Sequence, residues 1–287
     1  MAVLLTGGTG KTSRHLARML EDADIPFLVA SRGAEQNAPK GMIPVKFDWL
    51  DQSTYSSPFT HELPGKQKIT SAYIVPSPLA DSTSALTSFI DLAAQQYGVK
   101  RFVLLGYTTA TKDGPHLGKV WQHLDDIGVE YTVLRPTWFM ENLSELQHKP
   151  TIMQEGKIYS ACGDGKIPFV SARDIASVGF TCLTSLNPPP TDVTITGPEP
   201  LSYDEIALKL SSILGREIVH AKISTEQVQQ RYQNLGLAED YAKLLAWLEM
   251  YARDGFEATL EGEVEKVTGK APQSFDDWAQ ENKASWQ

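Results

Sequence analysis

Apolar and polar positions in the first half of the chain alternate between short apolar runs and longer stretches with helical spacing. The runs have the length and composition of buried strands. Helical patterns separate them after residue 10, over residues 82–97 and over residues 117–127. This alternation predicts right-handed βαβ units and therefore an α/β fold with a parallel sheet. The six predicted strands are Ala2 to Leu5, Ile25 to Ala30, Ile43 to Phe47, Ile69 to Val75, Phe102 to Leu105 and Glu130 to Leu134.

The pattern changes after Pro136, where the apolar runs become shorter and helical spacing dominates. We predict a boundary there: residues 1–136 form the doubly wound sheet, and residues 137–287 form a smaller, mostly helical region. The helix from Ile175 to Leu183 is expected to begin with Asp174 as its N-cap. Further helices are predicted at 203–214, 225–235, 238–253 and 276–284, and short strands, some returning to the main sheet, at Ile158 to Ser160, Phe169 to Val170 and Val193 to Ile195.

A glycine-rich stretch joins the first strand to the first helix. Glycines let the backbone turn tightly and approach a phosphate, and a helix N-terminus directs N–H groups at it. The spacing is G-G-x-G rather than G-x-G-x-x-G, and Ser13 stands where a third glycine packs helix on strand. Alone, this is also the pattern of an ordinary strand-to-helix corner. We predict a pyrophosphate site at Thr6, Gly7, Gly8, Thr9, Gly10, Lys11 and Thr12.

The end of the second strand carries Ser31 and Arg32, about 25 residues beyond Gly7. In dinucleotide folds this position meets the adenosine ribose: an acid binds the 2′-hydroxyl and an arginine accommodates a 2′-phosphate. Arg32 therefore favours NADP(H), although a surface arginine in a turn has the same sequence pattern. A polar loop over residues 34–42 follows.

Other predicted strands end in residues that a cofactor can contact, because the carboxyl ends of parallel strands share one edge of the sheet. Asp48 and Trp49 are candidates for the adenine, while Asp48 is equally a candidate helix cap. The rest of the predicted cofactor set is Pro76, Ser77, Pro78, Gly106, Lys119 and Pro136.

Charge is distributed unevenly along the chain. Residues 1–135 carry 13 Lys and Arg against 13 Asp and Glu, so the net charge of −9 lies entirely in residues 136–287. An acidic half argues against nucleic-acid binding. It is compatible with a cationic small molecule, but solvated helix faces explain it at least as well. With two cysteines, Cys162 and Cys182, no Cys/His cluster, no membrane-length apolar run and no signal peptide, we predict a cytoplasmic protein without metal. The sequence leaves the oligomeric state open.

Several landmarks recur in the order found in a known family. They are Thr6–Gly10, Val103–Leu105, Tyr131–Asn142, Gly165–Phe169, Asp174–Ala176 and Gly197–Glu199. Together they resemble the NmrA-like branch of the atypical short-chain dehydrogenases/reductases, and more narrowly the fungal clavine dehydrogenases of ergot-alkaloid pathways. The resemblance implies a Rossmann-like fold, a nicotinamide cofactor and reduction of a C=N bond in an indole alkaloid. Tyr107 is a departure, because a small residue is expected there.

The residues permit hydride transfer without an acid. Classical members pair a tyrosine with a lysine four residues later, but Tyr107 is followed by Thr111, with Lys112 one place too far. An iminium ion already carries its charge and needs no proton. We predict that Trp138, Phe139 and Met140 bind the substrate with Tyr107, and that Tyr107, Glu141 and Asp164 are the catalytic candidates. Each has a structural alternative: a core position for the aromatic group, a helix cap for Glu141 and a turn for Asp164.

Two other functions stay open on the sequence. One is a redox-mediated cyclase, in which NADPH-dependent reduction is coupled to an intramolecular Diels–Alder cycloaddition of a prenylated indole alkaloid. The other is a non-catalytic NmrA-like regulator that binds NADP(H) and senses redox state, since a missing Tyr/Lys pair suits it equally well.

Overall fold

The computed structural model describes the chain except residues 34–35, 37, 39–41, 80, 146 and 260. Most of the loop predicted at 34–42 therefore lies outside the described residues. The chain forms two compact units. The first comprises Met1–Ser77, Asp81–Arg135 and Ile175–Val193, and the second comprises Pro78–Ala80, Pro136–Asp174 and Thr194–Gln287.

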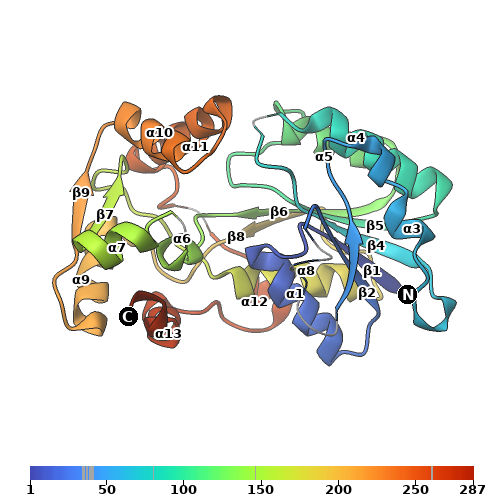
Figure 1. The fold of residues 1–287 in the computed structure, drawn as a ribbon, viewed down its shortest axis with the longest axis horizontal. Helices are drawn as coiled ribbons and strands as arrows, with labels where there is room; N and C mark the ends of the chain where they lie inside the picture. The colour runs from blue at the N-terminus through green and yellow to red at the C-terminus, as the bar shows by residue number, and fades with distance from the viewer. Residues whose placement is uncertain (34–35, 37, 39–41, 80, 146, 260) are drawn as a thin grey trace. The chain divides into compact units, whose positions relative to one another are not determined.

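A twisted parallel sheet is the centre of the first unit (Figure 1). Among the described residues its seven strands run in the order β3-β2-β1-β4-β5-β6-β8. The first six strands follow the order of doubly wound dinucleotide folds, and all six match a predicted strand. β8 is added at the β6 edge. The strands are β1 (Ala2–Thr6), β2 (Phe27–Ser31), β3 (Ile43–Lys46), β4 (Ile69–Ile74), β5 (Arg101–Leu105), β6 (Glu130–Pro136) and β8 (Asp192–Ile195).

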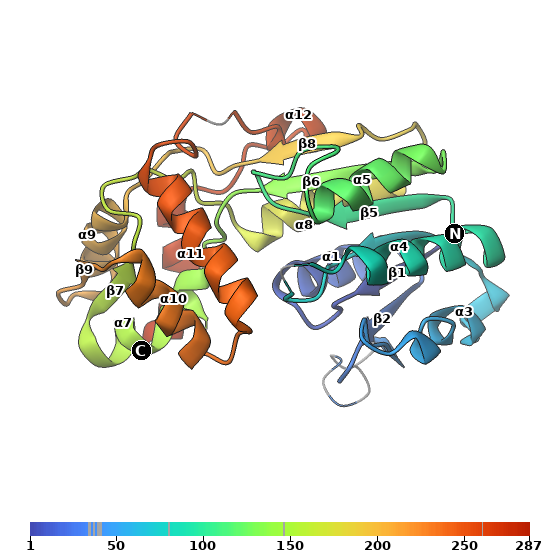
Figure 2. The same ribbon diagram turned by 90° about the horizontal axis from the view of Figure 1, so that it is seen from above.

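Helices cover both faces of this sheet, as Figures 1 and 2 show. On one face lie α4 (Thr83–Asp91), which continues as a π-helical turn at Leu92–Gln96, and α5 (Leu117–Asp126), preceded along the chain by the short α3 (Ser57–Thr60). On the other face lie α1 (Lys11–Asp22) and α8 (Ala172–Thr184). The helix predicted at 82–97 is thus confirmed in position, but its last turn is wider than an α-helix.

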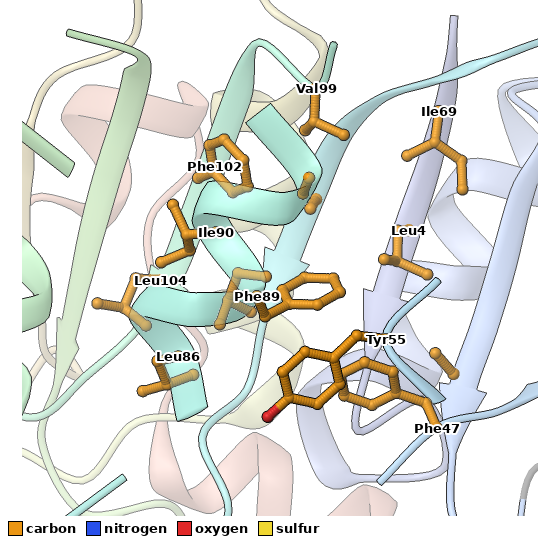
Figure 3. Packing of buried hydrophobic residues seen from close by; sticks show 14 of the residues in the cluster. Leu4, Phe47, Tyr55, Ile69, Leu86, Phe89, Ile90, Val99, Phe102 and Leu104 are labelled. Carbon is orange, nitrogen blue, oxygen red and sulfur yellow. The ribbon is translucent and has the colours of Figure 1, made fainter. Parts of the chain in front are cut away.

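Aromatic rings fill the core between the sheet and α4 (Figure 3). Phe47 lies with its ring centroid 5.5 Å from Tyr55 and 5.1 Å from Phe89. Trp49 packs edge-on against Phe47 at 4.7 Å and is 9% exposed. Offset and edge-on ring pairs of this kind add stability beyond the area they bury. They fix the segment that follows β3 against the helix layer.

Arg101 ties α8 to the sheet from the opposite face. The guanidinium is buried, pairs with Glu130 at 2.6 Å and donates to the carbonyls of Cys182, Leu183, Ser185 and Asn187. The last carbonyls of a helix have no partner within the helix, and a cation there also opposes the helix dipole. A charged side chain from β5 therefore terminates α8.

In the second unit, helices surround a parallel pair of strands, β7 (Lys157–Ser160) and β9 (Val219–Lys222). The predicted strand at Ile158 to Ser160 is confirmed. β9 was not predicted, because V-H-A-K is short and largely polar. α9 (Tyr203–Leu214) and α10 (Thr225–Asn234) each begin with a capping box. The remaining helices are α6 (Glu141–Ser144), α7 (Lys149–Glu155), α11 (Glu239–Arg253), α12 (Val264–Thr268), α13 (Phe275–Glu281) and a 3-10 turn at Lys283–Trp286.

The predicted N-cap of α8 is wrong. The helix begins at Ala172, and the hydroxyl of Ser171 accepts the N–H of Asp174 at 3.1 Å. The Asp174 carboxylate instead accepts the Ser171 hydroxyl at 2.8 Å and the N–H of Gln273 at 2.9 Å. Ser and Asp three residues apart both suit a helix start, and only the backbone path decides which one is the cap.

We expect Arg101→Met to lower the free energy of unfolding by about 3 kcal/mol, because it leaves buried carbonyls without a charged donor. Urea unfolding followed by circular dichroism measures the change. Lys100→Met, an exposed neighbour, is the control and should change stability by less than about 0.5 kcal/mol. Equal effects of the two substitutions would show that the Arg101 hydrogen bonds do not hold α8.

Candidate functional site

Two positions in the glycine turn after β1, Gly7 and Gly8, have little or no room for a side chain. Gly7 has a φ of +60°, and a Cβ there would lie 3.0 Å from Cβ of Val75. A Cβ at Gly8 would lie 2.1 Å from Cγ1 of Val29. The ends of β1, β2 and β4 therefore approach each other through bare backbone, which is the reason for two adjacent glycines here.

Helix α1 starts directly after this turn. Its N-cap residue, Gly10, offers no side-chain cap, and its first turn carries no acidic residue. The N-terminal N–H groups of a helix have no acceptor within the helix, so a start of this kind favours an anion such as a phosphate. Thr9 is exposed in the turn and Lys11 is half-buried at the first helical position.

Buried hydroxyls hold the turn in place. Thr6 donates to the carbonyl of Tyr73 at 3.0 Å and accepts the N–H of Val75 at 2.7 Å. The Tyr73 hydroxyl donates to Thr12 Oγ1 at 3.0 Å, and Ser13 donates to the carbonyl of Thr6 at 3.2 Å. Burial raises the pKa of Tyr73, so this hydroxyl keeps its proton. Thr6 and Thr12 thus support the turn with their side chains, and Ser13 replaces the third glycine by a hydrogen bond.

Two further hydroxyls at the same sheet edge lack partners. Within the described residues, the buried Oγ atoms of Ser31, at the end of β2, and Ser77, after β4, make no hydrogen bond. Leaving a buried hydroxyl unpaired costs about 1–3 kcal/mol, so such groups usually await a ligand or water. Arg32 follows Ser31 and is exposed. The glycine turn, the uncapped helix and these two hydroxyls fit a bound dinucleotide.

The residues after β3 have structural contacts instead. The indole N–H of Trp49 donates to the carbonyl of Val75 at 3.0 Å, and its ring belongs to the aromatic core. The Asp48 carboxylate accepts the N–H of Leu50 at 3.0 Å. Asp51, not Asp48, caps the following short helix by accepting the N–H of Ser53. The position of Trp49 in the sequence could not decide whether its ring covers an adenine or packs in the hydrophobic core.

At the ends of β5 and β6 lie Gly106, Tyr107 and Pro136. The N–H of Gly106 donates to the carbonyl of Leu134 at 2.8 Å, which ties the two strand ends together. Tyr107 is half-buried and packs against the core of the first unit, and Pro136 is buried. Pro76 precedes Ser77 in this unit, whereas Pro78 belongs to the second unit.

The lysines near Tyr107 are placed elsewhere. Lys112 forms an ion pair with Asp125, and this hydrogen bond raises the pKa of Lys112. Lys119 is exposed on α5 and lines a groove with Asp113, Gln122 and residues of α4. Lys112, one place too far along for the classical Tyr/Lys spacing, is thus engaged by Asp125.

Arg135, near the end of β6, holds two other segments of the first unit by hydrogen bonds. Its guanidinium binds both carboxylate oxygens of Asp192, at 2.6 and 2.8 Å, and donates to the carbonyl of Thr108 at 3.0 Å. A bidentate pair fixes both position and angle. The start of β8 and the segment after Tyr107 are thereby held to the end of β6.

The two carboxylates predicted as catalytic lie in the second unit. Glu141 is buried and accepts the N–H of Ala172 at 2.9 Å and the indole N–H of Trp278 at 3.2 Å, so it serves the start of α8. Asp164 is exposed and pairs with Lys222 at 2.6 Å. That hydrogen bond lowers the pKa of Asp164, which favours an ionised carboxylate over a proton donor.

Residues 138–140, which were predicted to bind the substrate, lie partly in the hydrophobic core of the second unit. Met140 is 1% exposed and its N–H donates to the carbonyl of Val170 at 2.9 Å. Phe139 and Val170 form an isolated bridge, and Trp138 is half-buried against the core of the second unit. Trp138 and Phe139 therefore keep an accessible part, whereas Met140 does not.

Sequence analysis missed Glu249. This carboxylate is fully buried, accepts the N–H of Ala161 and the hydroxyl of Tyr232, both at 2.5 Å, and borders a pocket between α7, β7, α10 and α11. Burial raises its pKa to about 7. The helical spacing in the sequence could have predicted its burial, because Glu249 falls on the same helical face as Ala242, Ala246 and Ala252.

Comparisons with known proteins cover the whole chain. It is 42% identical over 291 residues to festuclavine synthase II of Penicillium roqueforti, covering 100% of both chains. It is 40% identical over 289 residues to agroclavine dehydrogenase of Claviceps fusiformis, covering 100% of this chain and 99% of the relative. The chain belongs to the clavine dehydrogenase family. No protein-family model matches it.

Among solved structures, Citrobacter triphenylmethane reductase complexed with NADP(H) superposes with a TM-score of 0.76 at 21% identity. The alignment covers 98% of this chain and 99% of that one. At this identity the likeness confirms the Rossmann-like fold. Membership in the clavine dehydrogenase family makes the protein an oxidoreductase.

Over the described part of the chain, no helix is both long and apolar enough to cross a bilayer. The same residues contain no group of three or more His, Cys, Asp or Glu side chains arranged to hold a metal ion.

Glu249 should make stability depend on pH. The folded carboxyl titrates at about 7 and the unfolded one near its ordinary value of about 4.3. Between these two pKa values the folded state holds a proton on Glu249 that the unfolded state has released. The contribution of this proton to the free energy of unfolding is therefore complete below about pH 4 and is lost as the pH rises to 7. Neighbouring groups that face Glu249 are Tyr232, Cys162, Tyr203 and Arg231.

We therefore expect the free energy of unfolding of the wild type, relative to Glu249→Gln, to fall by up to about 3 kcal/mol between pH 5 and pH 8. Urea titrations of both proteins at each pH measure the difference. Parallel pH profiles of the two proteins would contradict the raised pKa.

Proposed function

We propose that this clavine dehydrogenase homologue is an NADPH-dependent reductase of a C=N bond, imine or iminium, in an indole alkaloid of a fungal secondary-metabolite pathway. The relatives named above carry the names agroclavine dehydrogenase and festuclavine synthase, so the substrate class follows their chemistry. NADP(H), the cofactor bound to the Citrobacter reductase, supplies the hydride.

The residues of the first unit support the choice of cofactor. The turn at Gly7 and Gly8 gives the pyrophosphate a path along bare backbone, and the uncapped start of α1 supplies N–H groups to it. The unpaired hydroxyls of Ser31 and Ser77 gain acceptors or donors from the bound cofactor. Arg32, exposed beside Ser31, is the residue for a 2′-phosphate.

The observation that carries the C=N assignment is that the sequence lacks the classical spacing of a tyrosine and a lysine four residues later. Reduction of a ketone requires a positioned acid, classically a tyrosine activated by a lysine, to protonate the oxygen. Here Thr111 stands four residues after Tyr107, and Lys112 is held by Asp125. An iminium carbon accepts hydride and its nitrogen becomes neutral, so no proton moves in that step. The protein needs only to orient the substrate, exclude water and favour the cation.

The acidic half of the chain fits such a cation. Asp164 stays ionised beside Lys222, and Tyr107 offers a ring and a hydroxyl at a strand end. Glu141 is committed to the start of α8, so we retain Tyr107 and Asp164 as candidates for substrate contact and leave Glu141 a positioning role.

The proposal is tested by adding a panel of indole iminium compounds to the purified protein with NADPH and following NADPH absorbance and products. Formation of a simple reduced amine supports it. A bicyclic product would identify the redox-mediated cyclase, and saturable NADPH binding without turnover across the panel would identify a redox sensor.

For the cofactor, we expect Arg32→Gln to raise the KM for NADPH about tenfold or more and to leave the KM for NADH nearly unchanged, because one charge-assisted contact to the 2′-phosphate is lost. Arg18→Gln, another exposed arginine of the same unit, is the matched control. An equal rise in KM for both cofactors would refute the assignment of Arg32.

A further inference from the structure

The second unit contains a pocket of its own, between α7, β7, α10 and α11 (Figure 2). Its volume is about 150 Å³, and every residue that lines it belongs to that unit. A cavity of this volume holds a molecule the size of one benzene ring. None of the lining residues is among those assigned above to the cofactor or to the substrate. The pocket is therefore a candidate for a second, small ligand.

Arg231 of α10 is the accessible charge of this pocket. Its guanidinium is half-buried and lies over the ring of Tyr159, 4.1 Å from the ring centroid. Within the described chain, this guanidinium makes no ion pair and no hydrogen bond. Stacking on a ring fixes the plane of a guanidinium and uses none of its N–H groups, which point outward in that plane. Arg231 thus keeps its donors for an anion that the protein does not supply.

Glu249, the carboxylate that lines the pocket, is already engaged. It is fully buried, and its two oxygens accept the N–H of Ala161 and the hydroxyl of Tyr232. That hydroxyl in turn accepts the amide N–H of Gln147 at 2.9 Å. A carboxylate enclosed and paired in this way offers little to a cationic ligand. The local charge open to a ligand is therefore positive, although the second half of the chain is acidic overall.

Apolar side chains form the wall beside Arg231. Val228 is 3% exposed, whereas Leu235, at the end of α10, is 47% exposed. Covering the exposed leucine with an apolar group is favourable, by about 25 cal/mol for each Å² buried. A carboxylate fits the planar fork of an arginine through two parallel hydrogen bonds. An anion with an apolar body uses both features, whereas inorganic phosphate uses only the charge.

We propose that this pocket binds a small monocarboxylate whose apolar body is about the size of one ring. Arg231 binds the carboxylate, Tyr159 holds the guanidinium in place, and Val228 and Leu235 contact the apolar body. The site is additional to the proposed reductase reaction and does not depend on it.

The test is a ligand-observed NMR titration of the full-length protein at pH 7, with benzoate as the probe. We expect saturable binding that cyclohexanecarboxylate displaces with similar affinity, because the body needs only to be apolar. Benzamide, which lacks the charge, and benzylamine, which reverses it, should bind about tenfold more weakly or worse. Inorganic phosphate should also compete at least about tenfold less well than benzoate.

Variants locate the binding. Arg231→Gln should weaken benzoate binding about tenfold or more, and Arg231→Lys should lie between this variant and the wild type, because it keeps the charge and loses the fork. Tyr159→Leu should weaken binding several-fold, whereas Tyr159→Phe, which keeps the ring, should resemble the wild type. Lys243→Gln is the control: it removes an exposed charge from α11 outside the pocket and should not change the affinity.

Four results would overturn the site. They are no saturation up to about 10 mM benzoate, tighter binding of benzylamine than of benzoate, equal competition by phosphate, and equal effects of Arg231→Gln and Lys243→Gln. Circular dichroism checks that the variants are folded, and the ligand panel tests the site on the wild type if a variant unfolds. None of these measurements uses NADPH turnover, so their failure leaves the reductase standing, and a failure of turnover leaves this site standing.

Discussion

The close approach of β1, β2 and β4 at their carboxyl ends is the constraint on which the first unit depends. No Cβ fits at Gly7 against Val75, or at Gly8 against Val29. The buried hydroxyl of Tyr73 then joins β4 to α1 through Thr12, and a Cβ at Gly179 of α8 would already lie 3.2 Å from the same tyrosine ring. One side chain thus connects the sheet, the glycine turn and the helix behind it.

Buried polar atoms at the strand ends of this protein include both paired and unpaired groups. The buried Arg101 and Glu141 and the half-buried Arg135 are engaged by carbonyls, carboxylates and N–H groups, as charges removed from water must be. The Oγ atoms of Ser31 and Ser77 are buried and unpaired, which is costly in the protein alone. The unpaired pair lies where parallel strands end, so a cofactor accounts for both the position and the cost.

The same reasoning, applied to apolar groups, distinguishes Met140 from Trp247 and Phe256. Met140 is enclosed in the core of the second unit, where burial alone explains an apolar side chain. Trp247 and Phe256 keep about half of their surface exposed, so burial explains neither.

The sequence by itself determined the parallel sheet, the glycine turn and the family, because these depend on local periodicity, on residues that lack a Cβ and on motifs contiguous in the chain. It did not determine which of several plausible side chains does each task. Ser171 rather than Asp174 caps α8, Trp49 enters the core, and Glu141 accepts an N–H from a residue 31 positions away. Those outcomes depend on contacts between distant segments and on which helix face is buried, and only the tertiary structure decides them.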